Sequence, residues 1–189
     1  MTLHYMKELF SVIEAAQVTD RSGKILDRTQ AAEALIRLFA SRRNAGKIMA
    51  VGNGGSAAIA SHTVNDLCKN CRISALCFSD YALLTCLAND CGYENAYKEA
   101  INLMADADDI IITISSSGKS ANILNAAEAA LGKGCYVCTL SGFAEDNPLR
   151  KMGDVNIYVP SARYGMVEMS HQAILHMITD CISERFQPA

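Results

Sequence analysis

Two segments rich in glycine and serine each follow a short apolar run, and this pattern constrains the fold strongly. The first is Val51-Gly52-Asn53-Gly54-Gly55-Ser56, which follows 47–50. The second is Ser115-Ser116-Ser117-Gly118-Lys119-Ser120, which follows 109–114. Each is typical of a buried strand that turns into a helix, where free backbone N–H groups, serine hydroxyls and a positive dipole end meet. Together they predict a parallel sheet whose carboxyl edge binds a phosphorylated small molecule.

The rest of the chain alternates between strand and helix patterns. Strands are predicted at 47–52, 73–78, 109–114, 135–140 and 155–159. Helices are predicted at 56–68, 80–88, 93–104, 120–131 and 165–185, with a short helical turn after Pro148. Such an alternation indicates an α/β fold with a parallel sheet covered by helices on both faces.

The N-terminal part has helical spacing of apolar residues in 4–19 and 27–45, separated by the polar break Asp20-Arg21-Ser22-Gly23. We expect the two helices to form an antiparallel pair that packs on the sheet or on another subunit. The chain is therefore interpreted as one domain over 1–189, with the helices in 1–45 used in oligomer packing and an α/β core in 46–189.

Composition excludes several classes of protein. A hydrophobic content of 50% and a charged content of 20% indicate a globular chain. The net charge of −3 argues against a nucleic-acid partner. The start has no signal-peptide pattern, and no apolar stretch reaches membrane-spanning length. We expect a cytoplasmic protein with no membrane partner.

The eight cysteines include the pairs Cys68-x-x-Cys71 and Cys135-x-x-Cys138. The two pairs are too far apart for a zinc ribbon. Residues 135–138 also have a strand pattern, which points the two thiols to opposite faces. The cysteines are interpreted as small buried hydrophobic residues in a reducing compartment, and a redox role for the pairs is left open.

The chemistry of the two loops narrows the ligand. Neither the dinucleotide pattern Gly-x-Gly-x-x-Gly nor the nucleotide P-loop is present, because Gly118-Lys119-Ser120 lacks the upstream glycine. We therefore expect no nucleotide cofactor. Ser56 alone would fit a plain helix cap, but the second loop has more serines than one cap needs. Ser115 and Ser117 are expected to donate from that loop while Ser120 caps the next helix, which favours a sugar phosphate.

Three motifs resemble those of the SIS (sugar isomerase) domain, and most of all its phosphoheptose isomerase group: Gly52-Asn53-Gly54-Gly55-Ser56, Asn89-Asp90-x-Gly92 and 114–122. The resemblance covers nearly the whole chain. It implies a five-stranded parallel sheet in a flavodoxin-like arrangement, and a homotetramer with active sites at subunit interfaces. It also implies isomerisation of sedoheptulose 7-phosphate to a heptose 7-phosphate through an enediol.

The resemblance also implies roles for single residues. The phosphate ligands would be Ser56, Ser115, Ser117 and Ser120, within substrate loops that include Gly54, Gly55 and Ser116. Asn53 and Asp90 would line the sugar site. His62 would bind a divalent metal, Asp66 would be a metal ligand or the base, and His176 would be the catalytic histidine.

The chain departs from the family pattern at several of these positions. Asp66 stands where a glutamate is expected, and Glu168 stands where a glutamine is expected. The segment 161–167 is one residue shorter than its counterpart, and Lys69-Asn70 lies where an arginine is usual.

The spacing of these residues is compatible with acid–base chemistry or with a metal. His62 and Asp66 are four residues apart and share a helix face. Glu168 and His176 are eight apart, about 12 Å along a helix, so joint action would need their side chains to lean together. Spacing alone leaves either His171 or His176 as a buried partner. In an isomerase, Asp66 or Glu168 would be the base, with His176 as partner acid or base. One divalent ion, zinc above all, would take His62, Asp66, Glu168 and His176 as ligands.

Two other functions remain open at this point. One is isomerisation of a different phosphorylated, acidic or sulfonated sugar, suggested by the departures at Asp66 and Glu168. The other is a non-catalytic protein that senses sugar phosphates or associates with a replication initiator. The presence of His62, Asp66, Glu168 and His176 favours an enzyme.

Overall fold

The computed structural model describes residues 2–186. In this range six strands form one sheet in the order β1-β6-β5-β4-β2-β3. The strands are β1 (Gln17–Asp20), β2 (Ile48–Gly52), β3 (Ala75–Cys77), β4 (Ile110–Ser115), β5 (Tyr136–Ser141) and β6 (Val155–Tyr158). All neighbours from β3 through β6 are parallel. Their order confirms the predicted flavodoxin-like parallel sheet.

Strand β1 corrects the prediction for the N-terminus. Helix α1 spans Thr2–Glu14, so the predicted helix 4–19 is too long. Residues Gln17–Asp20 instead run antiparallel to β6 at the edge of the sheet. Val18 and Thr19 are buried there, and β-branched side chains favour a strand over a helix.

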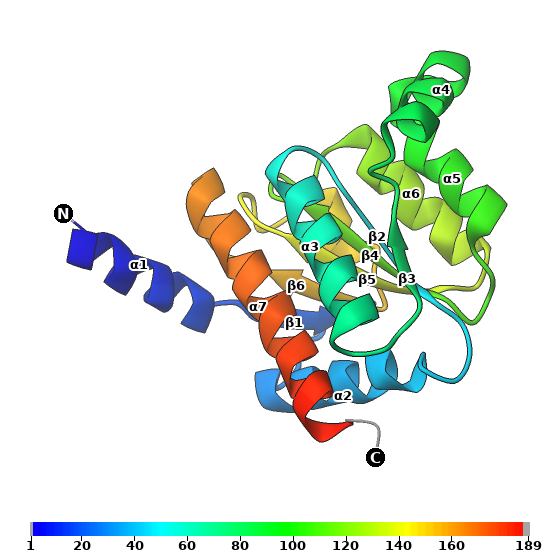
Figure 1. Ribbon diagram of the computed structural model, residues 1–189. Helices are drawn as coiled ribbons and strands as arrows, with labels where there is room; N and C mark the ends of the chain where they lie inside the picture. Colours follow the sequence, from blue (N-terminus) through cyan, green and yellow to red (C-terminus); the bar gives the residue numbers. More distant parts are fainter. Residues whose placement is uncertain (1, 187–189) are drawn as a thin grey trace.

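The two N-terminal helices do not form the expected antiparallel pair. Helix α2 (Arg28–Ser41) follows β1, which separates it from α1, and each helix packs against the last helix, α7 (Tyr164–Arg185). In Figure 1, α1 extends from one side of the molecule while α2 lies across the lower end of α7.

The remaining helices complete two layers around the sheet. They are α3 (Gly55–Lys69), α4 (Tyr81–Cys91), α5 (Ala96–Met104) and α6 (Ala121–Gly132), with 3₁₀ turns η1 (Tyr93–Asn95) and η2 (Pro148–Lys151). One core lies between the sheet and α2, α3 and α7, and the second lies between the sheet and α5 and α6 (Figure 1). Ile110 and Ile112 face the first core and Ile111 faces the second, which explains why the strands are apolar throughout. No described helix is long and apolar enough to cross a membrane.

The cysteines are all free thiols. Cys71, Cys135 and Cys138 are buried as expected, and burial raises the pKa of the Cys71 thiol to about 11. Cys68 and Cys86 are exposed, as is Cys91, so the interpretation as buried hydrophobic residues does not extend to them.

The turn from β2 into α3 places the site. A Cβ atom on Gly52 would lie 2.5 Å from the backbone carbonyl of Ser56, so only glycine allows the strand and the first helical turn to approach this closely. Gly54 is the N-cap residue of α3, with a φ of 53°. Ser56 is therefore the second residue of the helix, and not its cap as predicted from the sequence.

Candidate active site

The two serine loops meet at the carboxyl edge of the sheet and enclose a cavity of about 140 Å³. β2 and β4 are paired neighbours, with Gly52 opposite Ile114, so the turns that follow them lie together. The cavity is lined by Asn53, Ser56, Ile114, Ser115, Ser116, Ser117, Ser120, Tyr164 and Glu168. The structure therefore brings together every serine that the sequence assigned to phosphate binding.

The serine hydroxyls retain hydrogen-bonding capacity toward the cavity. Ser115 Oγ accepts from the Gly118 backbone N–H at 3.2 Å, and Ser117 Oγ accepts from that of Lys119 at 3.2 Å. Ser120 occupies the N-cap position of α6, but its side chain makes no capping bond, contrary to the prediction, and lies 3.3 Å from Ser115 Oγ. Hydroxyls that accept from the backbone keep their own hydrogens, which a phosphate oxygen can accept.

Two helices begin at this cavity. Gly54 and Gly55 start α3, and Ser120 starts α6. Their free N–H groups and positive dipole ends add to the attraction of an anion.

Asn53 is held in a polar network that sequence reasoning missed. Asn53 and Asn122 exchange amide hydrogen bonds of 2.9 and 2.8 Å, and the Tyr93 hydroxyl donates to Asn53 Oδ1 at 2.8 Å. Asn122 closes the second serine motif, so its place in that motif was the available signal. Asp90 is not brought to the cavity: it is exposed on α4, where it accepts from Asn89 at 2.9 Å.

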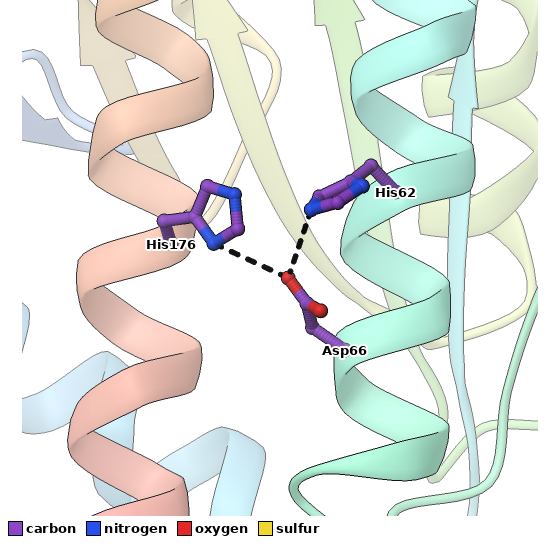
Figure 2. Close-up of side chains that lie close together, drawn as sticks. All are labelled: His62, Asp66 and His176. Carbon is purple, nitrogen blue, oxygen red and sulfur yellow. Dashed lines mark ion pairs between the residues drawn. The ribbon is translucent and has the colours of Figure 1, made fainter.

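A second group of side chains lies between α3 and α7. Asp66 Oδ2 is 3.4 Å from His62 Nε2 and 3.2 Å from His176 Nδ1. Figure 2 shows both histidines turned toward this carboxylate. The two imidazole rings meet edge to face with centroids 4.7 Å apart. Asp66 Oδ1 accepts from Asn70 Nδ2 at 3.2 Å, which fixes the carboxylate. Asp66 is buried, whereas the two histidine side chains are 50% and 40% exposed, so the group is open to solvent on one side.

The donor set of this group fits a divalent metal. One ligand atom from each of the three residues lies within 4.8 Å of the other two. Two imidazole nitrogens and one carboxylate oxygen are the ligand types that zinc takes, at about 2.0–2.2 Å from each atom. The two histidine nitrogens lie within 3.4 Å of the same carboxylate oxygen, so the three ligand types are already gathered in one place.

Glu168 lies outside this group. It lines the serine cavity, and a Cβ atom on Gly55 would be 2.5 Å from its carboxyl oxygens. The carboxyl group of Glu168 therefore lies over the first residue of α3, while His176 faces Asp66 further along. The structure places the two α7 residues in separate parts of the site, as their spacing of eight residues indicated.

His171 is the buried histidine of α7. Its Nε2 is 3.1 Å from the Ser141 carbonyl oxygen, so Nε2 carries the hydrogen and donates it. Nδ1 is buried without a partner among the described residues. Burial lowers the pKa of His171 to about 4, which keeps the ring neutral near pH 7. Spacing had left His171 and His176 as alternatives, and the structure makes His171 the core residue.

Comparisons with known proteins agree with this arrangement. The phosphoheptose isomerase of Syntrophotalea carbinolica is 33% identical over 183 residues, which cover 93% of this chain and 92% of that protein. The solved phosphoheptose isomerase of Neisseria gonorrhoeae superposes with a TM-score of 0.73 at 32% identity, over 82% of this chain and 84% of that one. The solved phosphoheptose isomerase of Francisella tularensis also superposes with a TM-score of 0.73. It is 28% identical, over 83% of this chain and 85% of that one.

The model of the SIS domain matches residues 4–142, which include both serine loops and the His62–Asp66 helix. The family model and the alignment with the Syntrophotalea carbinolica relative together cover the sheet, the serine cavity and the group between α3 and α7. The chain belongs to the SIS domain family.

Proposed function

We propose that this protein is an aldose–ketose isomerase of sugar phosphates, with sedoheptulose 7-phosphate as substrate and a heptose 7-phosphate as product. The observation that carries the proposal is the placement of the serine cavity and the His62–Asp66–His176 group along one helix, α3. Ser56 and His62 are separated by about 9 Å along the helix axis. A seven-carbon sugar bound by its terminal phosphate would extend from the first site toward the second.

The serine cavity would bind the phosphate. The hydroxyls of Ser56, Ser115, Ser117 and Ser120 would donate to its oxygens, supported by the starts of α3 and α6. Asn53, fixed by Asn122 and Tyr93, would orient the adjoining sugar hydroxyls. Asp90 remains a candidate for the sugar site only if a neighbouring subunit or a movement of α4 brings it there.

The proton transfer between C1 and C2 needs a base and an acid. Asp66, buried between two imidazoles, is one candidate base, and His176 would be its partner for the substrate oxygens. Glu168 is the alternative base, because its carboxyl group lies in the cavity itself. The variants Asp66→Asn and Glu168→Gln distinguish the two candidate bases, because loss of the true base should lower kcat more.

A divalent metal, zinc above all, fits the proposal. His62 Nε2, His176 Nδ1 and the Asp66 carboxylate would hold it, with Glu168 as a further ligand only if its side chain turns toward them. When bound, the ion would supply stabilisation of the negative charge that develops on the substrate oxygens.

We also propose a homotetramer with active sites at subunit interfaces and a cytoplasmic location. Exposed apolar side chains on α1 support the first, since such patches mark interaction surfaces. The eight free thiols are compatible with a reducing compartment.

The test is an isomerisation assay on a panel of five-, six- and seven-carbon ketose phosphates, with and without added zinc. We expect the highest kcat/KM with sedoheptulose 7-phosphate, and deuterium at C2 of the aldose when the reaction is run in D₂O. Turnover of another phosphorylated or acidic sugar instead would favour the alternative substrate suggested by Asp66 and Glu168. No turnover, with inorganic phosphate still raising the melting temperature, would favour a non-catalytic sensor or replication-initiator partner.

A further inference from the structure

Asn147 lies behind the second serine loop without lining the cavity. Its side chain is fully buried in the segment between β5 and β6. It packs so closely on Gly118, whose φ is +63°, that a Cβ atom there would lie 1.9 Å from Asn147 Oδ1. The serine loop and Asn147 therefore fit each other only while position 118 has no side chain.

The amide of Asn147 also bonds the segment on which the serine loop rests. Its Nδ2 is 3.2 Å from Ser141 Oγ, 3.2 Å from the Gly142 carbonyl oxygen and 2.8 Å from that of Ala144. Its Oδ1 accepts from the Arg150 N–H at 3.1 Å and so caps η2. The two amide hydrogens serve these three acceptors by sharing, and Oδ1 accepts from Arg150, so both ends of the amide are used. No carboxylate or hydroxyl of similar size offers two donor hydrogens together with an acceptor.

The same segment holds the serine loop through the backbone. The Gly142 N–H donates to the Ser116 carbonyl oxygen at 3.0 Å, and the Leu149 N–H donates to that of Gly118 at 3.2 Å. Both donors come from the stretch that Asn147 ties together. Its side chain therefore connects the two points at which the loop is anchored.

We propose that Asn147 is a positioning residue for the phosphate site: it holds loop 115–120 in the conformation that turns the serine hydroxyls toward the cavity. This rests on the proposed function, which assigns phosphate to that cavity. A displaced loop would lower the affinity of the protein for the phosphate group. It would leave the His62–Asp66–His176 group between α3 and α7 in place.

The main variant is Asn147→Ser. Serine is an uncharged residue that also caps helices, so it keeps an acceptor for Arg150 while removing the amide from Gly118. We expect KM for the sugar phosphate and the dissociation constant for inorganic phosphate to rise about 10- to 100-fold, with kcat at saturation within about twofold.

Asn156→Ser is the matched control. Asn156 is also fully buried, and its side chain is hydrogen-bonded to partners that include Thr139 and Gly153. It lies near the start of β6, away from the carboxyl edge of the sheet where the serine cavity is. It should lower the melting temperature without changing KM. An equal rise of KM in both variants would reduce Asn147 to a general contribution to stability and overturn the proposal.

A second set of variants covers the case in which Asn147→Ser does not fold. Gly118→Ala should raise KM because the new methyl group would overlap Asn147 and because alanine is strained at a φ of +63°. The double variant should raise KM by less than the product of the two single effects, because removal of the amide makes room for the methyl group and leaves only the backbone strain. Additive effects would contradict the proposal.

Ser120→Ala separates this proposal from the assignment of the cavity. If Ser120→Ala weakens phosphate binding and Asn147→Ser does not, only the role of Asn147 is wrong. If neither variant changes phosphate binding, the phosphate site itself is wrong, and the positioning role is wrong with it.

Discussion

At the scale of single residues, the serine hydroxyls can be tested one at a time. Ser117 and Ser120 line the cavity from the loop before α6, and neither side chain caps that helix. Each hydrogen bond to a charged group contributes about 1.5–3 kcal/mol, so Ser117→Ala and Ser120→Ala should each raise KM roughly 10- to 100-fold. Steady-state kinetics and melting curves check this. Unchanged KM in both folded variants would contradict the phosphate assignment.

The acid–base residues should respond differently from the serines. His176→Asn and Asp66→Asn should lower kcat by about 10²–10⁴-fold, because they remove proton transfer or a metal ligand. Thermal stabilisation by inorganic phosphate should persist in both variants, since neither Asp66 nor His176 lines the serine cavity. If Glu168 is the base, Glu168→Gln will be the more damaging change. Full activity after exhaustive chelation would make His62 a positioning residue, and an active His176→Asn enzyme would exclude His176 from the chemistry.

His171 predicts a pH dependence of stability. Its folded pKa of about 4 is below the ordinary 6.5, so between these values the unfolded chain binds a proton that the folded protein does not. Stability should therefore fall as pH drops from 7 to 5, by about 2 kcal/mol from this residue. His171→Gln keeps an N–H donor for Ser141 and does not titrate. Urea unfolding at both pH values should show a smaller loss in the variant, and an equal loss would refute the assignment.

At the scale of elements, the turn from β2 into α3 depends on Gly52. Gly52→Ala would place a Cβ atom 2.5 Å from the Ser56 backbone, which cannot move without shifting the start of α3. We expect a loss of about 1–3 kcal/mol in unfolding free energy and weaker phosphate binding. Gly132→Ala is the control: the position near the end of α6 has open space around it, so alanine should be neutral or stabilising. Similar melting temperatures for Gly52→Ala and the unmodified protein would contradict the claim that the turn requires glycine at position 52.

The elements also show which parts of the fold the sequence could predict. The five parallel strands were predictable because apolar runs and glycine or serine turns are local signals. β1 was not, because Gln17–Asp20 has only one apolar residue among four, and pairing with β6 is what makes this short segment a strand. Helix lengths depend on such tertiary contacts more than on propensity.

Some parts of the candidate site could likewise be predicted from the sequence, and others depend on contacts between distant segments. The serine cavity followed from motifs that each lie within a few residues. The contact of Asp66 with His176 depends on how α3 packs against α7, so spacing alone could not predict it and the family resemblance was needed. Asn122, Tyr93 and Asn147 act through side-chain contacts between distant segments, which leave little trace in a single sequence.

At the scale of the whole molecule, α1 exposes an apolar face. Leu3, Met6 and Phe10 are 80%, 57% and 62% exposed, and their spacing places them along one side of the helix. At the end of α1, a mostly apolar groove of about 420 Å³ lies between α2 and α7, with Ile13 of α1 and Ile174 and Met177 of α7 among its lining residues. Exposed apolar surfaces of this kind are typical of subunit interfaces.

The tetramer prediction can be tested at this face. Light scattering of the unmodified protein should give four times the chain mass, whereas Phe10→Glu should give smaller species, because a carboxylate cannot be buried there without a partner. Leu103→Glu, which changes a residue of α5 that is 71% exposed, should remain tetrameric. The His62 and His176 side chains are half open to solvent, so a site completed by a neighbouring subunit should lose activity in parallel with assembly. A fully active monomer would show that each chain holds a complete site and that α1 has another role.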